Sequence, residues 1–254
     1  MTNAHDAMPL SNSVLNNSEI IIENEFAALG LHPAIVKALD DLNYKKPTPV
    51  QAQAIPAFLA GRDLLVSSQT GSGKTAAFML PALQLISQKP RPEVVKPQRG
   101  VKGRRPRPAP ACPHLIVLTP TRELAQQVTS ATTQFDKYLR RTICASIVGG
   151  MPYPRQLEML AKMPDILVAT PGRLLDHMNS GRIDLSQLSM LVFDEADRML
   201  DMGFSEDIDA IVGQTPETRQ TLMFSATLDG RTGELAADML RDPVRVAIAQ
   251  EQMD

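Results

Sequence analysis

Residues 64–75 read LLVSSQTGSGKT, a short apolar run followed by a glycine-rich turn and a lysine. This order is typical of a strand, a phosphate-binding loop and the start of a helix. Backbone N–H groups around Gly71 and Gly73 can point inward because no side chain obstructs them, and a helix N-terminus attracts anions. We expect Lys74 to reach the β- and γ-phosphates of a nucleotide and the Thr75 hydroxyl to bind Mg²⁺. A plain glycine-rich turn before a helix is the structural alternative.

Six further apolar runs follow the first one, separated by segments with helical patterns. They lie at 115–118, 143–148, 166–168, 190–193, 222–224 and 244–248. Continuous apolar runs indicate strands buried on both faces, and their alternation with helices indicates a doubly wound α/β domain. We therefore expect a mostly parallel central sheet flanked by helices on both faces. Two helices should precede the sheet, at 33–42 and 49–59, the second capped by Thr48 ahead of Pro49.

Nearly every apolar run ends in a small or charged cluster. The clusters are SSQTGSGKT, TPTREL, VGGMP, ATPGR, DEAD and SAT. Because the carboxyl ends of parallel strands share one edge of the sheet, all six clusters should meet there. Asp194 and Glu195 at the end of a buried strand would carry a large desolvation cost without a cation or basic partner. A Mg²⁺–nucleotide site supplies such a cation. Asp194 would then hold the metal and Glu195 would deprotonate an attacking water. The alternative is that the two acids simply lie at a helix N-terminus, which favours negative charge.

Taken together, these segments resemble the DEAD-box family of ATP-dependent RNA helicases. The resemblance covers residues 26–248 and the first of that family's two RecA-like domains, so it implies a RecA-like P-loop NTPase fold with ATP and Mg²⁺ as cofactors. The matching motifs are the Q-motif at Phe26 and 44–51, motif I at 68–75, motif Ia at 120–124, a glycine pair at 149–150, motif Ib at 170–173, motif II at 194–197 and motif III at 225–227. Ser68 stands where the family usually has alanine and the general loop pattern has glycine.

The resemblance implies a nucleotide site built from two segments. Binding falls to Phe26, Tyr44, Lys46, Thr48, Gln51, Ser68, Gln69, Thr70, Gly71, Ser72, Gly73, Lys74 and Thr75. Thr75 and Asp194 would hold the metal, and Lys74, Asp194 and Glu195 would be catalytic. The Gln51 amide offers the donor and acceptor that adenine N6 and N7 need. Tyr44 would stack on the base, unless it is a plain core aromatic.

The resemblance also implies sequence-independent binding of an RNA backbone at three strand ends. The residues are Pro120, Thr121, Arg122, Gly149, Gly150, Thr170, Pro171, Gly172 and Arg173. Thr119 and Thr170 have the pattern of N-caps, and helix N-termini, glycine amides and arginines are suitable phosphate donors. Taken alone, each arginine is better explained as a solvated or salt-bridged side chain. Hydrogen bonds from Asp197 to Ser225 and Thr227 are expected to couple the nucleotide site to the RNA side.

The net charge of −2 over 254 residues hides an uneven distribution. Residues 89–113 hold eight basic residues, one acid and seven prolines, so this segment carries +7 and the rest of the chain −9. Its composition cannot form a packed element, and we expect an exposed loop. The loop is either a solvated insertion or an electrostatic tether for a nucleic-acid backbone.

The sequence predicts four successive regions and a reduced, cytoplasmic setting. The regions are a loose tail at 1–24, a helical Q-motif region at 25–60, a RecA-like ATP-binding domain at 61–248 and a linker stub at 249–254, with the second RecA-like domain absent. No apolar stretch reaches the roughly 18 residues of a membrane span, and no secretory signal is visible. Cys112 and Cys144 have the pattern of two ordinary thiols, although the fold could still pair them.

The function expected from these features is that of the ATP- and RNA-binding domain of a helicase. Mg-ATP hydrolysis would be coupled to RNA binding and local duplex unwinding once the second RecA-like domain is present, and the monomeric domain alone should hydrolyse ATP poorly. A DNA-directed helicase and a non-catalytic RNA-binding scaffold are the alternatives on the same fold. A small-molecule kinase would explain residues 68–75 but leave the other motifs without a role.

Overall fold

The computed structural model describes residues 23–69, 73–90, 108–140 and 142–248. Within these residues seven strands form one sheet in the order β3-β4-β2-β5-β6-β1-β7, and every neighbouring pair is parallel. The strands are β1 (Leu64–Ser67), β2 (Leu115–Leu118), β3 (Cys144–Ile147), β4 (Ile166–Ala169), β5 (Met190–Asp194), β6 (Gln220–Ser225) and β7 (Val244–Ala247). All seven expected runs are therefore strands, and the sheet is parallel throughout.

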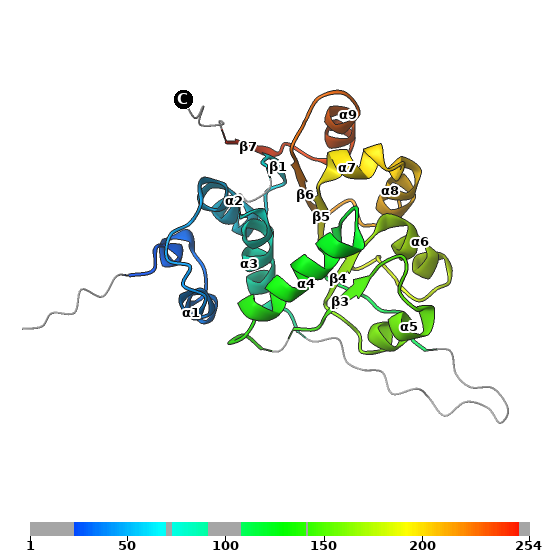
Figure 1. Ribbon diagram of the computed structural model, residues 1–254, viewed down its shortest axis with the longest axis horizontal. Helices are drawn as coiled ribbons and strands as arrows, with labels where there is room; N and C mark the ends of the chain where they lie inside the picture. Colours follow the sequence, from blue (N-terminus) through cyan, green and yellow to red (C-terminus); the bar gives the residue numbers. More distant parts are fainter. Residues whose placement is uncertain (1–22, 70–72, 91–107, 141, 249–254) are drawn as a thin grey trace, which may run out of the picture.

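Helices cover both faces of the sheet (Figure 1). One face packs against the 3₁₀ helix η1 (Glu25–Leu29), α1 (Pro33–Asp41), α2 (Pro49–Leu59), α3 (Lys74–Ser87) and α4 (Arg122–Phe135). The other face packs against α5 (Tyr153–Ala161), α6 (Pro171–Asn179), α7 (Ala196–Asp201), α8 (Ser205–Val212) and α9 (Gly230–Met239). Val66 lies in the first core and Leu65 in the second, because successive strand residues point to opposite faces. In the part described, no helix is both long and apolar enough to cross a membrane.

The folded part of the chain begins earlier than the sequence suggests. Asn24 was expected at the end of the loose tail, but it is buried and caps η1 by accepting a hydrogen bond from the Phe26 amide, 3.0 Å. Its Nδ2 also donates to Asp40 Oδ1 at 2.7 Å and to the Tyr44 carbonyl at 2.8 Å. The Phe26 ring is buried in the core, and η1 must be held in place for the ring to pack there. The hydrogen bonds of Asn24 hold η1 in this position.

The proline-rich loop is also shorter than expected at its carboxyl end. Residues 91–107 lie outside the described residues, as do 1–22 and 249–254. Ala111, expected in the exposed loop, is buried and pairs with Ile183: its amide donates to the Arg182 carbonyl, and its carbonyl accepts from Asp184, both at 2.9 Å. These backbone bonds anchor the chain just before β2.

Of the three expected threonine caps, Thr48 caps α2 as predicted, but Thr119 does not cap α4. Thr121, not Thr119, caps α4: its hydroxyl accepts from the Leu124 amide at 3.3 Å. Thr119 is buried two residues before the cap, and its hydroxyl donates to the Thr121 carbonyl at 3.3 Å instead. Thr170 does precede α6, but its hydroxyl makes no capping bond to that helix.

Both cysteines are free thiols, as the sequence predicts. Burial raises the pKa of Cys144 to about 12 and also raises that of Cys112. A thiol with a raised pKa holds its proton at neutral pH and is a poor nucleophile. Neither residue therefore has the properties of a reactive cysteine.

Candidate functional site

The polar clusters of the sequence lie along the carboxyl edge of the sheet, and the strand order divides this edge into two halves. The β1/β5/β6 half consists of the segments after three neighbouring strands, residues 68–75, 194–197 and 225–227. The β2/β3/β4 half consists of residues 119–122, 148–152 and 170–173. The residues expected to bind a nucleotide and those expected to bind RNA therefore occupy adjacent halves of one edge.

A cavity of about 280 Å³ opens in the β1/β5/β6 half. Its lining residues come from the three strand ends: Ser68, Lys74, Glu195, Asp197, Arg198, Ser225 and Ala226. The Ser68 hydroxyl is buried and has no hydrogen-bond partner within the described residues. Most of the lining residues were predicted from the sequence, and Arg198 is a site residue that sequence reasoning missed.

Lys74 pairs with two carboxylates in this cavity. Its Nζ lies 3.0 Å from Asp194 Oδ1 and 3.1 Å from Glu195 Oε1. Burial lowers the pKa of Lys74, but the attraction of Asp194 and Glu195 outweighs it, so the pKa lies above its ordinary value. Lys74 is therefore a fully charged ammonium at neutral pH, as a phosphate-binding lysine must be.

The two carboxylates reach Lys74 through an unusual backbone turn. Asp194 is the last residue of β5 and is 1% exposed, and burial raises its pKa, which Lys74 opposes. Glu195 has φ +58°, a left-handed conformation that a non-glycine residue adopts only at some cost. This turn directs both acids to one lysine, and Glu195 Oε2 also lies 3.4 Å from Arg198 Nη1.

The residues present fit a Mg²⁺–nucleotide. Asp194, Glu195 and the half-buried Thr75 in the first turn of α3 supply carboxylate and hydroxyl oxygens, which Mg²⁺ prefers. No group of three or more potential metal-binding side chains occurs in the residues described. Mg²⁺ needs none, because it is usually bound by one or two carboxylates together with substrate phosphates. Thr70, Gly71 and Ser72, expected to bind the phosphates, lie outside the described residues, and Gln69 beside them is exposed.

The Q-motif contacts the start of α3 through Gln51. Gln51 Oε1 accepts from the Thr48 amide at 2.9 Å and Nε2 donates to the Gly73 carbonyl at 3.1 Å. These two bonds use one lone pair and one N–H of an amide that has two of each. Gly73 has φ +79°, and a Cβ there would overlap the Gln51 amide. The Q-motif and the nucleotide loop are therefore in direct contact.

The aromatic residues of the Q-motif differ in their exposure. Tyr44 is 49% exposed, so the core alternative is wrong and its ring is accessible to a ligand. Lys46 is also exposed. Phe26, expected among the nucleotide-binding residues, is 2% exposed and lies in the core instead, where its ring cannot contact a bound base. Its apolar ring packs η1 against the core.

Motif III forms the expected hydrogen bonds. The Asp197 amide donates to Ser225 Oγ at 3.3 Å. Asp197 Oδ2 accepts from both the Thr227 amide, 3.3 Å, and the Thr227 hydroxyl, 3.1 Å. The loops after β5 and β6 are thus joined by side chains as well as by strand pairing.

The β2/β3/β4 half contains the nine residues expected to contact RNA, with different degrees of exposure. Arg122, Gly149 and Gly150 are exposed, Thr121, Gly172 and Arg173 are half-buried, and Pro120, Thr170 and Pro171 are buried. Thr170 Oγ1 accepts from the Gly149 amide at 3.2 Å, so motif Ib and the glycine pair are directly linked. Gln156 and His177 also bind residues of this half and were missed, since neither belongs to a recognisable pattern.

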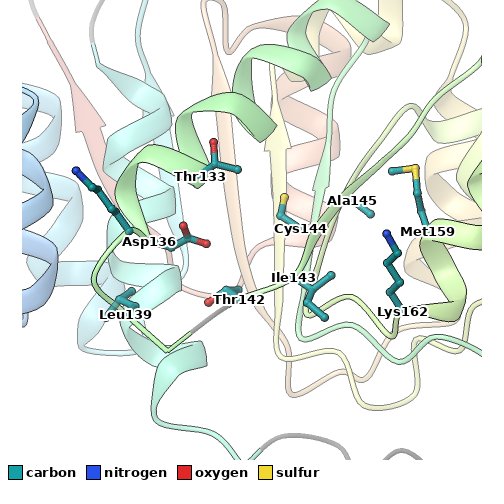
Figure 2. Close-up of a pocket in the computed structure, with 10 residues that line it drawn as sticks. Thr133, Asp136, Leu139, Thr142, Ile143, Cys144, Ala145, Met159 and Lys162 are labelled. Atoms are coloured by element: carbon teal, nitrogen blue, oxygen red, sulfur yellow. The ribbon is translucent and has the colours of Figure 1, made fainter.

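A second, larger cavity lies at the opposite edge of the sheet (Figure 2). Its volume is about 500 Å³, and it lies between the end of α4, the start of β3 and the end of α5. None of the predicted site residues lines it. Asp136 points into it, and burial raises the pKa of this carboxyl to about 6. The candidate site is therefore the smaller cavity, where the motifs meet.

The fold and the carboxyl edge define an α/β domain of the RecA-like class. The DEAD/DEAH box helicase family matches residues 48–235, and the chain belongs to this family. The chain is 47% identical over 226 residues to ATP-dependent RNA helicase DeaD of Escherichia coli K12, a match that covers 89% of this chain and 33% of that protein. It is 40% identical over 221 residues to ATP-dependent RNA helicase DeaD of Mycobacterium tuberculosis, covering 87% and 36%.

Solved structures show the same fold. The crystal structure of a DEAD box protein from Methanococcus jannaschii matches with a TM-score of 0.76 at 32% identity and covers 88% of this chain and 56% of that one. A hypothetical ATP-dependent RNA helicase from Sulfolobus tokodaii matches with a TM-score of 0.71 at 36% identity, covering 85% and 56%. The chain spans about a third of the length of the curated relatives it matches.

We predict that Gly73→Ala destabilises the domain more than Gly61→Ala. Both glycines have a positive φ, +79° and +82°, so both variants lose about 1 kcal/mol to backbone strain. A Cβ at position 61 meets nothing within 4 Å, whereas one at position 73 displaces the Gln51 amide, which we expect to cost about 1–3 kcal/mol more. Urea unfolding measures both; equal losses would contradict direct packing of Gln51 on the loop.

We predict that Asp136→Asn stabilises the protein at pH 7 but not at pH 4. The pKa of Asp136 is raised from 3.8 to about 6 by burial, so the folded state favours the neutral acid and loses stability as the pH rises through about 6. Allowing for solvent exposure, removal of the charge should add about 1 kcal/mol at pH 7. Unfolding midpoints at both pH values test this, with exposed Asp209→Asn on α8 as control. A gain of equal size at pH 4 would contradict the assignment.

Proposed function

We propose that this chain is the ATP- and RNA-binding domain of a DEAD-box RNA helicase. In the proposed enzyme, Mg-ATP hydrolysis is coupled to sequence-independent RNA binding and local duplex unwinding, together with a second RecA-like domain. The observation that supports this best is the contact of Lys74 with both Asp194 and Glu195, next to the β2/β3/β4 half of the same edge. The DeaD relatives are named as ATP-dependent RNA helicases, which favours RNA. The two free thiols fit the proposed cytoplasmic setting.

On this proposal, the N-terminus of α3 and Lys74 bind the phosphates, while Thr75 and Asp194 hold Mg²⁺. The bound metal would neutralise charge that develops on the transferred phosphoryl group. Gln51 and Tyr44 are the candidates for binding the base. A side-chain amide can pair with the donor and acceptor edge of adenine but not with the two acceptors of guanine, so ATP is preferred over GTP.

Glu195 is the proposed general base. Its Oε1 is paired with Lys74 and its Oε2 with Arg198. Each oxygen of Glu195 faces a cation, so an attacking water would compete with Lys74 or Arg198 for the carboxylate. Transfer of Lys74 from the carboxylates to the phosphates leaves Glu195 Oε1 free to accept a proton from water. Phosphate binding and activation of the base are therefore linked through one ammonium group.

The RNA backbone is proposed to lie over the β2/β3/β4 half. The exposed Arg122 and the exposed Gly150 suit contacts with phosphate oxygens, and the exposed Gly149, whose amide donates to Thr170 Oγ1, leaves room for the backbone beside them; none of the three reads a base. Asp197, Ser225 and Thr227 are proposed to couple this half to the nucleotide site: their hydrogen bonds join the loops after β5 and β6, and β5 pairs with β2 of the other half. The arginines that complete the ATP site are proposed to come from the second domain.

We predict that Glu195→Gln retains ATP binding but loses hydrolysis. Glutamine keeps the size of the side chain but carries no charge and cannot accept the proton, so turnover should fall about 10²–10³-fold. Nucleotide affinity is measured on this chain, and RNA-stimulated hydrolysis on a protein with both domains. Glu206→Gln, an exposed residue of α8, is the matched control.

Turnover by Glu195→Gln at the wild-type rate would contradict the proposed role of the glutamate. Stimulation by single-stranded DNA as strong as that by RNA would favour the DNA-directed alternative instead. A wild-type protein that binds RNA but shows no ATP hydrolysis at all would favour the non-catalytic scaffold.

A further inference from the structure

The loop between β3 and α5, residues 148–152, is held by side chains from outside the loop. Gln156 on α5 donates from Nε2 to the Val148 carbonyl at 2.7 Å. Arg173 on α6 donates from Nη1 to the Met151 carbonyl at 3.0 Å. Two consecutive helices therefore bind the two ends of the loop that contains the glycine pair.

The middle of the loop is fixed as well. Gly149 donates its amide to Thr170 Oγ1, and Gly150 has φ +80°, a conformation that glycine adopts at no steric cost. Both glycines are exposed, and a Cβ at Gly150 would lie 4.0 Å from Arg122 Nη1. The exposed face of the loop is thus next to an exposed arginine of motif Ia.

Gln156 connects these contacts to one another. It is completely buried, and its Oε1 accepts from Arg173 Nη1 at 3.3 Å and lies 2.8 Å from His177 Nε2. Because Nε2 of the amide donates to Val148, the group that faces Arg173 and His177 is the oxygen, which can only accept. His177 Nε2 must therefore carry the hydrogen. We call Gln156, Arg173 and His177 the Gln156 network.

His177 is held as a neutral ring. It is completely buried on α6, and burial, followed by the nearby Arg173, lowers its pKa. The ring stacks on Tyr153 of α5, with centroids 4.5 Å apart and an angle of 13° between the planes. Since its one hydrogen points to Gln156, the histidine fixes the orientation of the amide and links α6 to α5.

The Gln156 network also limits what Arg173 can do. Nη1 of this half-buried guanidinium is committed to the Met151 carbonyl and to Gln156. An arginine used in this way fixes the position of the loop first, and only its remaining N–H groups are available to a phosphate. Phosphate contact by the loop therefore depends on Gln156 and His177, which are completely buried.

We propose that Gln156 and His177 are positioning residues for RNA binding. They hold Arg173 and the loop 148–152 in the arrangement that receives a phosphate of the RNA backbone. This inference rests on the proposed function, and it assigns RNA affinity, rather than nucleotide affinity, to two buried residues that contact neither ligand.

The test uses Gln156→Met, which keeps the length of the side chain and removes its polar atoms. We expect the Kd for single-stranded RNA, measured by fluorescence anisotropy on this chain, to rise about tenfold, equivalent to about 1.4 kcal/mol. The Kd for a fluorescent ATP analogue should stay within about twofold, since the side-chain hydrogen bonds of Gln156 within the described residues reach only Val148, Arg173 and His177. Hydrogen exchange of the Gly149 amide should accelerate, because the loop loses its anchor.

Gln220→Met is the matched control. Gln220 Nε2 also donates to backbone carbonyls, those of Phe58 at 2.9 Å and Arg62 at 2.7 Å, but at the opposite end of the sheet. This variant should lose stability without a change in RNA affinity. At position 177, His177→Gln places an N–H donor near the position of Nε2 and should retain RNA binding, whereas His177→Phe keeps the ring stack and should weaken it.

The outcomes separate the inference from the proposed function. If the wild-type chain binds RNA and Gln156→Met binds it equally well, the positioning role is wrong and the proposed function stands. If Gln220→Met weakens RNA binding as much as Gln156→Met does, the effect is one of general stability and the inference is also overturned. If the wild-type chain binds ATP but no RNA, both the proposed function and this inference are overturned.

Discussion

A buried carboxylate at the end of the central strand needs a cation beside it, and much of this domain is arranged to supply one. Asp194 is 1% exposed, and an unpaired charge at such a position costs several kcal/mol or forces protonation. Lys74 supplies this cation from the start of α3, the helix that follows β1. In the sheet only β6 lies between β1 and β5, so the start of α3 lies close to the end of β5. Strand order and ion pair therefore depend on each other.

The same strand order determines how the edge is divided. Pairing of β2 with β5 joins the two halves, so the loops of β2, β3 and β4 lie on one side of that pair and those of β5, β6 and β1 on the other. Each half has its own side-chain links: Asp197 with Thr227 in one, and Gln156 with Arg173 and Val148 in the other. A rigid connection within each half allows a contact at one loop to affect its neighbours.

Sequence patterns predicted the fold and the location of the site, but not the partners of individual side chains. Continuous apolar runs gave all seven strands because a strand covered on both faces needs apolar residues at every position. Phe26 was placed at the nucleotide and lies in the core, since a motif position does not state which way a ring points. Gln156 and His177 carried no signal, because their contact exists only where α5 packs beside α6.

The ion pairs of Glu195 have a chemical meaning under the proposed function. Both of its oxygens have cationic partners, Lys74 Nζ at 3.1 Å and Arg198 Nη1 at 3.4 Å. Lys74 cannot neutralise the two acids and bind phosphates at full strength at the same time. Under the proposed function, binding of phosphates therefore draws the lysine away and leaves Glu195 Oε1 open to a water molecule. The ammonium that stabilises the buried Asp194 is thus also the group proposed to bind the phosphates, so the ion pair and the nucleotide compete for one lysine.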